Sequence, residues 1–448
     1  MARPPRHRVT SLESERHTMR HRYLSTALAL ALIGGLTAGC GSDSAGSANE
    51  INLIMSNHPW QRAIEPLIDE FEQESGVTVK VQTFAEQQMR DKVQLNLQSR
   101  SSSMDVFMTL PSREGPQFAK ANYYEPLDER AGGATEYKVD DFPEAVRAGM
   151  TVNDKMIAAP INVEGVVLYY RTDLFQQYGV KPPTTLDELT TAAEQIKQKS
   201  GGKVTPIALR GQSAALPFTF GPFLHSEGVK WTKDDGTPNF DDPKAVAAID
   251  RYATLAREYG PPGVVNNTFT QSSALFAAGD AAMELESSNE LSSIVDPKTS
   301  KVAENIGVLD FPAGSAGSKT TVLSWGLAIS SFSKNKDAAW KFVQWATSAE
   351  TQLELTKAGI APPRTSVSQD PAYTATLNTE TLKQWNTALT KAQTGGETEV
   401  GPVGVAAAEM RKVIGDAVGK VILGRASAEE AAKEIQTGLT PLLAKNTQ

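Results

Sequence analysis

The sequence is poor in the residues on which much catalytic and metal chemistry depends. Cysteine occurs once, at Cys40, and only two of the five histidines, His58 and His225, lie beyond residue 39. We therefore expect no Cys–His catalytic pair, no metal site and no cofactor. The chain also lacks the GxSxG, HExxH, GxGxxG and GxxxxGK[ST] motifs. Scattered Asp and Glu side chains leave a glycosidase pair open as an alternative.

Long hydrophobic runs are absent as well. The apolar run from Leu24 to Leu36 has 13 residues, whereas a membrane-spanning helix needs about 20. Because Arg20 and Arg22 precede the run and small residues follow it, the pattern predicts a signal peptide over residues 1–39. Either Met1 or Met19 could begin it.

Cys40 stands directly after the predicted signal peptide. The segment Leu36-Thr37-Ala38-Gly39-Cys40 resembles the lipobox of bacterial lipoproteins. This resemblance implies a lipid on Cys40 that anchors the protein to the cell membrane, outside the cytoplasm. The alternative is an unlipidated protein with a free thiol. Residues 40–49 are small and polar, which predicts a flexible tether.

Negative charge outweighs positive charge after the signal peptide. The formal net charge of the chain is −8, and the first 39 residues hold six Arg against two Glu, so the remainder carries −12. An acidic body of this kind repels nucleic acid and anionic lipid head groups. We therefore expect no nucleic-acid partner, and no membrane contact other than the lipid.

The body of the chain alternates strand and helix patterns, and its length predicts two or three packed units. Apolar or alternating runs predict strands at 51–55, 77–81 and 105–108, separated by helical patterns. This order predicts an α/β fold with parallel, doubly wound sheets. Further helices are predicted from a Thr cap at 184–185 to about 199, and at 243–259, 270–278, 335–348, 350–358, 379–393 and 405–422.

Six segments, in this order and spacing, resemble one family. They are 105–107 with 118–128 (DVF…FAKANYYEPLD), 159–165 with 168–175 (APINVEG…LYYRTDLF), 183–189 (PTTLDEL), 276–283 (FAAGDAAM), 334–342 (KNKDAAWKF) and 362–364 (PPR). Together they resemble the extracellular solute-binding proteins, family 1, which serve carbohydrate ABC importers and include the maltose-binding proteins. The resemblance covers roughly residues 50–445.

The resemblance implies a two-lobed periplasmic-binding-protein fold of type II, with a ligand cleft at the hinge. It implies a first lobe of residues 50–163 and 325–362 and a second lobe of residues 164–324 and 363–448. Chain crossings between the lobes are then expected near 162–166, 320–326 and 360–364. In this fold, hinge closure buries the solute and presents both lobes to the permease subunits of the importer. The implied protein is a monomeric receptor and not an enzyme.

A sugar site needs aromatic faces for the apolar side of the ring, and polar groups for its hydroxyls. Glu164 is the best-supported candidate because it aligns with a sugar-contacting Glu of maltose-binding proteins. Trp325, at the second crossing, is expected to stack on the ligand, since the family's usual Trp after the 281–285 strand is missing here. The other candidates follow predicted strands or lie at crossings: Asn57, His58, Trp60, Thr109, Arg113, Asn162, Glu286, Asn289, Ser324 and Arg364.

Two alternatives to a sugar receptor remain at this point. The same fold could bind another solute, such as a polyol phosphate or an oligopeptide. A phosphate ligand would require clustered Arg side chains or a helix N-terminus in the cleft. The second alternative is the extracellular hydrolase, which would convert a glycoside instead of returning it unchanged.

Overall fold

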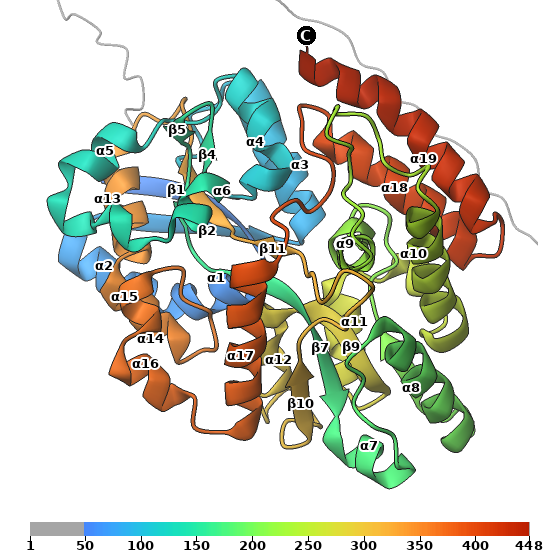
Figure 1. Ribbon diagram of the computed structural model, residues 1–448. Coiled ribbons are helices and arrows are strands. Elements are labelled where there is room, and N and C mark those ends of the chain that lie inside the picture. The colour runs from blue at the N-terminus through green and yellow to red at the C-terminus, as the bar shows by residue number, and fades with distance from the viewer. Residues whose placement is uncertain (1–48, 448) are drawn as a thin grey trace, which may run out of the picture. The chain divides into compact units, whose positions relative to one another are not determined.

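The structure is a computed structural model that describes residues 49–447. The predicted signal peptide, Cys40 and nearly all of the predicted tether lie outside these residues. The described residues contain two main β-sheets, each packed with helices, and we refer to the two resulting halves as lobes (Figure 1).

The first sheet has five strands in the order β2-β1-β3-β12-β6. β1 (Glu50–Ser56) pairs in parallel with β2 (Thr78–Phe84) and with β3 (Val106–Thr109). β12 (Gly326–Ile329) runs antiparallel to β3 and to β6 (Ala159–Pro160). The three strands that the sequence predicts in this region are confirmed as β1, β2 and β3.

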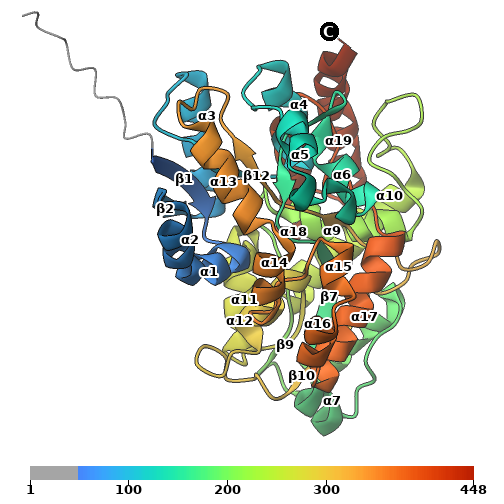
Figure 2. The ribbon, with the colours of Figure 1, turned by 90° about the vertical axis from the view of Figure 1, so that its left-hand side faces the viewer.

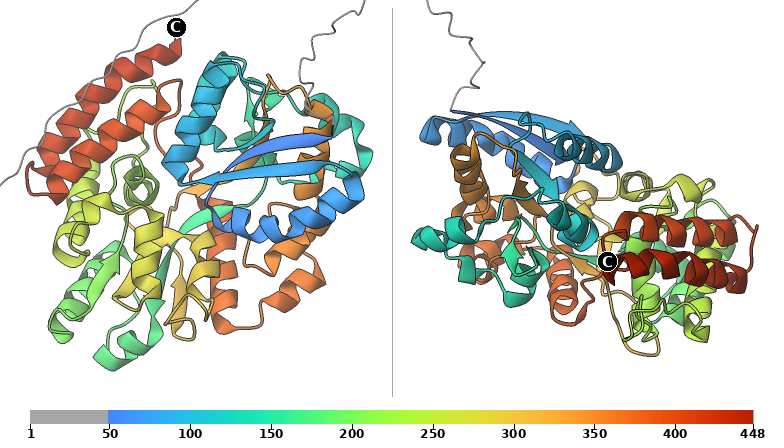
Figure 3. Two further views of the ribbon diagram at one scale, coloured as in Figure 1. Left: turned by 180° about the vertical axis from the view of Figure 1, so that it is seen from behind. Right: turned by 90° about the horizontal axis from the view of Figure 1, so that it is seen from above.

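Helices pack around this sheet and complete the first lobe. In α3 (Glu86–Gln98), Met89, Val93 and Leu97 are buried at a spacing of four residues, so one face of the helix covers β1. Seen from behind in Figure 3, α3 lies to one side of β1 and β2, and α1 and α2 lie to the other. The remaining elements of this lobe are α1 (Pro59–Ile64), α2 (Ile68–Ser75), α4 (Pro111–Lys120), α5 (Asp128–Gly133), α6 (Glu144–Gly149), β4 (Thr151–Val152), β5 (Lys155–Met156), α13 (Lys336–Ala346), α14 (Ala349–Thr356), α15 (Thr365–Ser368) and α16 (Pro371–Thr376) (Figure 2).

The second sheet has the order β10-β7-β9-β8. β7 (Glu164–Arg171) is antiparallel to β10 (Ile306–Leu309) and to β9 (Ala281–Ser287), and only β8 (Thr205–Ala208) and β9 are parallel. The expectation of parallel pairing therefore fails in this sheet. The physical reason is that residues 172–280 lie between β7 and β9, which is long enough for the chain to return to β7 from either end, so the alternation of strands and helices does not fix the direction of β9.

The helices of the second lobe are largely those that the sequence predicts. Thr185 caps α8 (Leu186–Lys199) by accepting from the backbone N of Glu188 at 3.2 Å, as expected from the Thr cap. The last helix, α19, was not predicted; it lies beside α18 in Figure 3. The other elements are α7 (Thr172–Tyr178), α9 (Leu216–Ser226), α10 (Pro243–Thr254), α11 (Phe269–Ala277), α12 (Leu291–Ile294), β11 (Val322–Leu323), α17 (Glu380–Gly395), α18 (Ala407–Ile422) and α19 (Ala428–Leu443).

Short extended segments connect the two sheets. Residues 161–163 join β6 to β7, and residues 324–325 join β11 to β12. A third crossing was expected at 360–364. The chain stays in the first lobe there, since α15 and α16, which follow these residues, pack on α14 of that lobe. The chain reaches the second sheet only at α17, which packs on β10 and β7, so this crossing lies near residues 377–379.

Candidate functional site

The two connecting segments at 161–163 and 324–325 are bonded to each other. The backbone N of Trp325 donates to Oδ1 of Asn162 at 3.0 Å, and the N of Ile161 donates to the carbonyl of Trp325 at 2.9 Å. The hydroxyl of Ser324 donates to the carbonyl of Asn162. Asn162 therefore fixes the connection between the lobes, with its side chain bound within the protein.

Glu164 is the first residue of β7 and is 4% exposed. Its carboxylate lies 3.0 Å from Nε2 of His58 and accepts from Nδ2 of Asn162 at 2.9 Å and from the hydroxyl of Ser287 at 2.5 Å. Burial alone would raise the pKa of Glu164, but His58 and these hydrogen bonds lower it below its ordinary value. Glu164 is thus held as a carboxylate where the first lobe, a connecting segment and the second lobe meet.

A cavity of about 40 Å³ lies beside Glu164, between the two lobes. Four of the predicted ligand residues line it, namely His58, Arg113, Glu164 and Trp325. The remaining lining residues are Glu86, Leu110, Arg210, Phe218, Phe269, Ser287, Glu290, Leu323, Val400 and Arg411. The structure therefore brings side chains from distant parts of the sequence together at one point, which we call the cleft cavity.

The first lobe contributes an ion-pair network to the cleft cavity. Glu86 contacts Arg90 at 3.0 Å and Arg113 at 3.2 Å, and Arg90 also pairs with Glu114. Burial would raise the pKa of Glu86, but the charges of Arg90, Arg113 and Arg210 together lower it to about 2. The pKa of Arg113 falls to about 10, mainly through burial and then through the charge of Arg90.

The second lobe contributes a buried ion pair and the carboxyl group of Glu290. Nε of Arg210 donates to Glu286 at 2.8 Å, and the guanidinium lies 4.6 Å from the ring of Phe218. Glu290, in the turn after β9, is 5% exposed. Burial, followed by the charge of Glu286, raises the pKa of Glu290 to about 7. Glu290 can therefore be neutral near neutral pH.

Trp325 is 4% exposed, and other side chains already contact its ring. The guanidinium carbon of Arg90 lies 4.9 Å from the ring centroid, and the ring of His58 lies at 5.7 Å with a tilt of 50°. Arg90 therefore makes a cation–π contact with the indole. Stacking of this ring on a ligand stays a prediction.

The other predicted residues lie away from the lining of the cleft cavity. Trp60 and Thr109 are fully buried, and Thr109 bonds to the hydroxyl of Tyr124 at 2.9 Å. Asn289 is also fully buried. Glu286 lies behind Arg210, where the two side chains form their ion pair.

Ser324 and Arg364 line a different cavity, of about 140 Å³. Nε of Arg364 donates to the carbonyl of Thr347 at 2.7 Å, and its guanidinium carbon lies 4.0 Å from the ring of Phe142. These contacts hold Arg364 within the first lobe.

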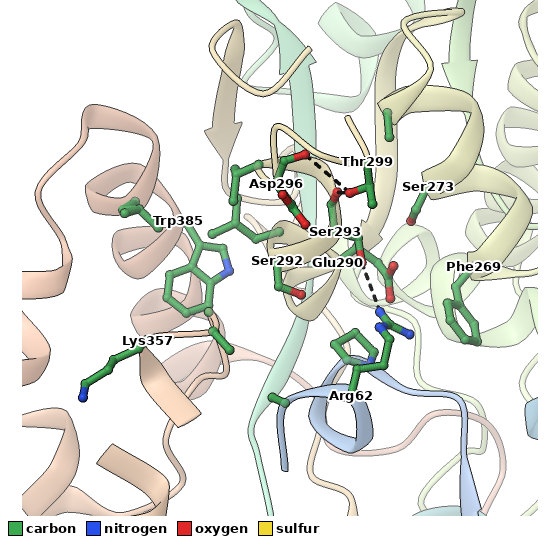
Figure 4. Close-up of a pocket in the computed structure, with 18 of the residues that line it drawn as sticks. Arg62, Phe269, Ser273, Glu290, Ser292, Ser293, Asp296, Thr299, Lys357 and Trp385 are labelled. Atoms are coloured by element: carbon green, nitrogen blue, oxygen red, sulfur yellow. Dashed lines mark hydrogen bonds between the residues drawn. The ribbon is translucent and has the colours of Figure 1, made fainter. Parts of the chain in front are cut away.

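Asn57 lines a larger cavity of about 930 Å³, shown in Figure 4. This cavity shares Phe269 and Glu290 with the cleft cavity, so the two are neighbours. Arg62, in α1, crosses between the lobes here by donating to the hydroxyl of Ser293 at 3.1 Å (Figure 4).

Six charged or aromatic residues of the cleft cavity were not predicted: Glu86, Arg210, Phe218, Phe269, Glu290 and Arg411. Glu86 and Arg210 follow strands β2 and β8, so the strand-end rule that selected Arg113 could have selected them. For Arg411, in the middle of an amphipathic helix pattern, the sequence holds no comparable signal.

Residues 49–447 contain neither a helix suited to a bilayer nor a side-chain cluster suited to a metal ion. No helix in this range is both long and apolar enough to span a membrane. Nor do three or more His, Cys, Asp or Glu side chains of this range form a group that could hold a metal ion.

Comparison with known proteins identifies the family of this chain. The family model described as bacterial extracellular solute-binding protein matches residues 57–353. The mannitol-binding protein of Pseudomonas aeruginosa is 30% identical over 303 residues, which span 65% of this chain and 68% of that protein.

Two solved structures are similar over most of their length. A solute-binding protein of Agrobacterium radiobacter K84 in complex with ribitol has a TM-score of 0.79 and 25% identity, over 88% of this chain and 98% of that one. One from Agrobacterium vitis S4 with bound D-mannitol has a TM-score of 0.75 and 29% identity, over 89% and 99%. The expected two-lobed fold of type II is confirmed. Since the family model covers well over half of the sequence, the chain belongs to the bacterial extracellular solute-binding proteins of ABC transporters.

Proposed function

We propose that this protein is the extracytoplasmic receptor of an ABC importer, and that it binds a polyol or a small sugar in the cleft cavity. The observation that carries the proposal is the convergence of Arg113, Glu164, Arg210 and Glu290 at one interlobe cavity. Hydroxyl groups both donate and accept hydrogen bonds, so a polyhydroxylated ligand can satisfy guanidinium and carboxylate groups together.

The aromatic content of the cleft cavity favours an open-chain ligand over an oligosaccharide. The cavity of about 40 Å³ is smaller than a polyol, so the lobes must move apart to admit one. Arg90 packs on the ring of Trp325, and Arg210 packs on that of Phe218. Among the described lining residues, Phe269 is the aromatic side chain that keeps substantial exposure. A pyranose needs open aromatic faces, whereas an open-chain polyol depends mainly on polar contacts. The mannitol- and ribitol-binding relatives support the same choice.

Calorimetric titration with D-mannitol, ribitol, D-glucose and maltose tests this proposal. We expect saturable binding of at least one polyol and weaker binding of maltose. A thermal-shift assay provides an independent check, because ligand at 100 times its Kd adds about 2.7 kcal/mol of stability. If no polyhydroxylated compound binds, the proposed ligand class is wrong.

We further propose that the protein acts as a monomer and returns its ligand chemically unchanged. The family of substrate-binding proteins supports a receptor over the alternative hydrolase. Incubation with glycosides followed by product analysis distinguishes the two, because a receptor yields no product. Light scattering of the purified protein tests the monomeric state.

We also propose that a lipid on Cys40 anchors the receptor to the membrane. The proposal rests on the lipobox-like segment ending at Cys40. Two acyl chains hold a protein stably at a membrane, whereas one gives marginal binding. Cys40→Ala should therefore release the protein from the membrane fraction, and retention of the variant would contradict the anchor.

A further inference from the structure

Three arginines reach the cleft cavity from three different elements. Arg113 comes from α4 in the first lobe, Arg210 follows β8, and Arg411 lies in α18 in the second lobe. Arg113 has Glu86 as an acidic partner, and Arg210 has Glu286. Within residues 49–447, Arg411 forms no ion pair.

Backbone carbonyl groups fix the position of Arg411. One terminal nitrogen donates to the carbonyl of Val400, the other donates to that of Ala214 at 2.9 Å, and Nε has no hydrogen-bond partner among the described residues. The residue is 4% exposed. Among residues 49–447 no carboxylate bonds to this guanidinium, and the charge of Glu86 acts on it only from a distance.

An unpaired guanidinium at this position is energetically unfavourable. Burial, and next the charge of Arg113, lower the pKa of Arg411 well below its ordinary value. An arginine nevertheless stays protonated in proteins, and an uncompensated buried charge is destabilising. Glu290, which also lines the cavity, can take up a proton because its pKa is about 7. Arg411 has no such relief, because it stays protonated.

The packing of the helices brings Arg113 and Arg411 to the same cavity, where the charge of each acts on the other. α4 contacts α18 across the lobe boundary, and the cavity lies where both helices reach it. An anion between the two guanidinium groups would neutralise Arg411 and connect the lobes. Nε of Arg411 and the second hydrogen of each terminal nitrogen remain available as donors to the oxygens of a carboxylate or a phosphate.

We propose that the ligand of the cleft cavity is an anionic polyol, whose carboxylate or phosphate group binds between Arg411 and Arg113 and whose hydroxyls contact the remaining polar walls. This inference rests on the proposed function, and it narrows the ligand class from polyhydroxylated compounds in general to those that carry a negative charge.

Calorimetry with two matched series tests the inference. One series is ribitol, D-ribonate and ribitol 5-phosphate, and the other is D-mannitol, D-mannonate and D-mannitol 1-phosphate. We expect an anionic member to bind about tenfold more tightly than its neutral parent, or better, since hydrogen bonds to charged groups add about 1.5–3 kcal/mol. The carboxylate and phosphate members distinguish the two kinds of anion.

Substitutions at the arginines show whether the preference arises at the proposed position. Arg411→Gln and Arg113→Gln should each reduce the ratio of anionic to neutral affinity about tenfold, and Arg411→Lys, which keeps the charge but not the planar donor geometry, should keep part of it. This ratio does not depend on the folded fraction. Arg257→Gln is the matched control. Like Arg411, Arg257 donates to a backbone carbonyl, that of Val421 at 3.1 Å, but it does not line the cavity.

The outcomes separate this inference from the proposed function. Equal or tighter binding of the neutral polyols, or an unchanged affinity ratio in both Gln variants, would overturn the anionic ligand while leaving the receptor function in place. Absence of binding by every member of both series would overturn both.

Discussion

Replacing Glu164 by Gln changes the charge but hardly the shape of the side chain where the lobes meet. The carboxylate contacts or accepts from His58, Asn162 and Ser287, and it is 4% exposed. A glutamine keeps one acceptor oxygen, so its amide nitrogen must face one of these donors. One unsatisfied buried donor costs about 1–3 kcal/mol, and the weakened neutral hydrogen bonds cost about 1 kcal/mol more. We therefore expect unfolding free energy to fall by about 2–4 kcal/mol.

Acid stability provides a second test of Glu164. Its pKa is lowered in the folded protein, so its contribution is present above the unfolded pKa of about 4.3 and is lost as pH falls through the lower folded pKa. Below pH 4.3 the wild type should lose the stability that the Glu164 carboxylate contributes. Glu164→Gln should lack this part of the acid-induced loss because glutamine does not titrate.

Denaturant unfolding at pH 7 and at acidic pH measures both effects. Glu354→Gln is the control, since Glu354 pairs with Lys357 on the surface and should change stability by less than about 0.5 kcal/mol. If Glu164→Gln is as stable as Glu354→Gln and shows the same acid dependence as the wild type, the buried network is not stabilising and this reasoning is refuted.

Three further substitutions test separate parts of the structure. The raised pKa of Glu290 makes wild-type stability fall as the pH rises from the unfolded pKa of about 4.3 to the folded value of about 7. Glu290→Gln should therefore gain stability relative to the wild type above pH 7, compared with the difference at pH 4, and identical pH profiles of unfolding for the two proteins would contradict this. Arg210→Met should cost about 3–5 kcal/mol in denaturant unfolding, since it leaves Glu286 buried without its partner, and a loss below about 1 kcal/mol would contradict the pairing. Ser427→Ala should cost about 1 kcal/mol by removing the cap bonded to the N of Glu430 at 3.2 Å, and an unchanged thermal midpoint would argue against the cap.

Local patterns in the sequence predict the elements better than their pairing. The period of the apolar residues predicts β1, β2, β3 and most long helices, because burial on one face depends on neighbouring residues alone. The antiparallel pairing of β7 with β9 depends on where the chain enters the second sheet. α19 could have been predicted, since Ser427 and Glu430 form a capping box.

The candidate site follows the same division. Glu164 was identified through a family motif, and His58 and Arg113 were identified because they follow strands; all three line the cleft cavity. Arg411 reaches it only through the packing of α18 against α4, which no local pattern encodes. The contact of Arg90 with Trp325 likewise depends on tertiary packing, so the sequence alone does not predict that Arg90 covers the Trp325 ring.

A crystal structure of the protein with its tightest-binding polyol or polyol anion would test the proposed site most directly. We expect the ligand to lie in the cleft cavity, within hydrogen-bond distance of Arg113 and Arg411 and beside Glu164. A ligand bound instead in the 930 Å³ cavity between α1 and α12, with the cleft cavity empty, would contradict it.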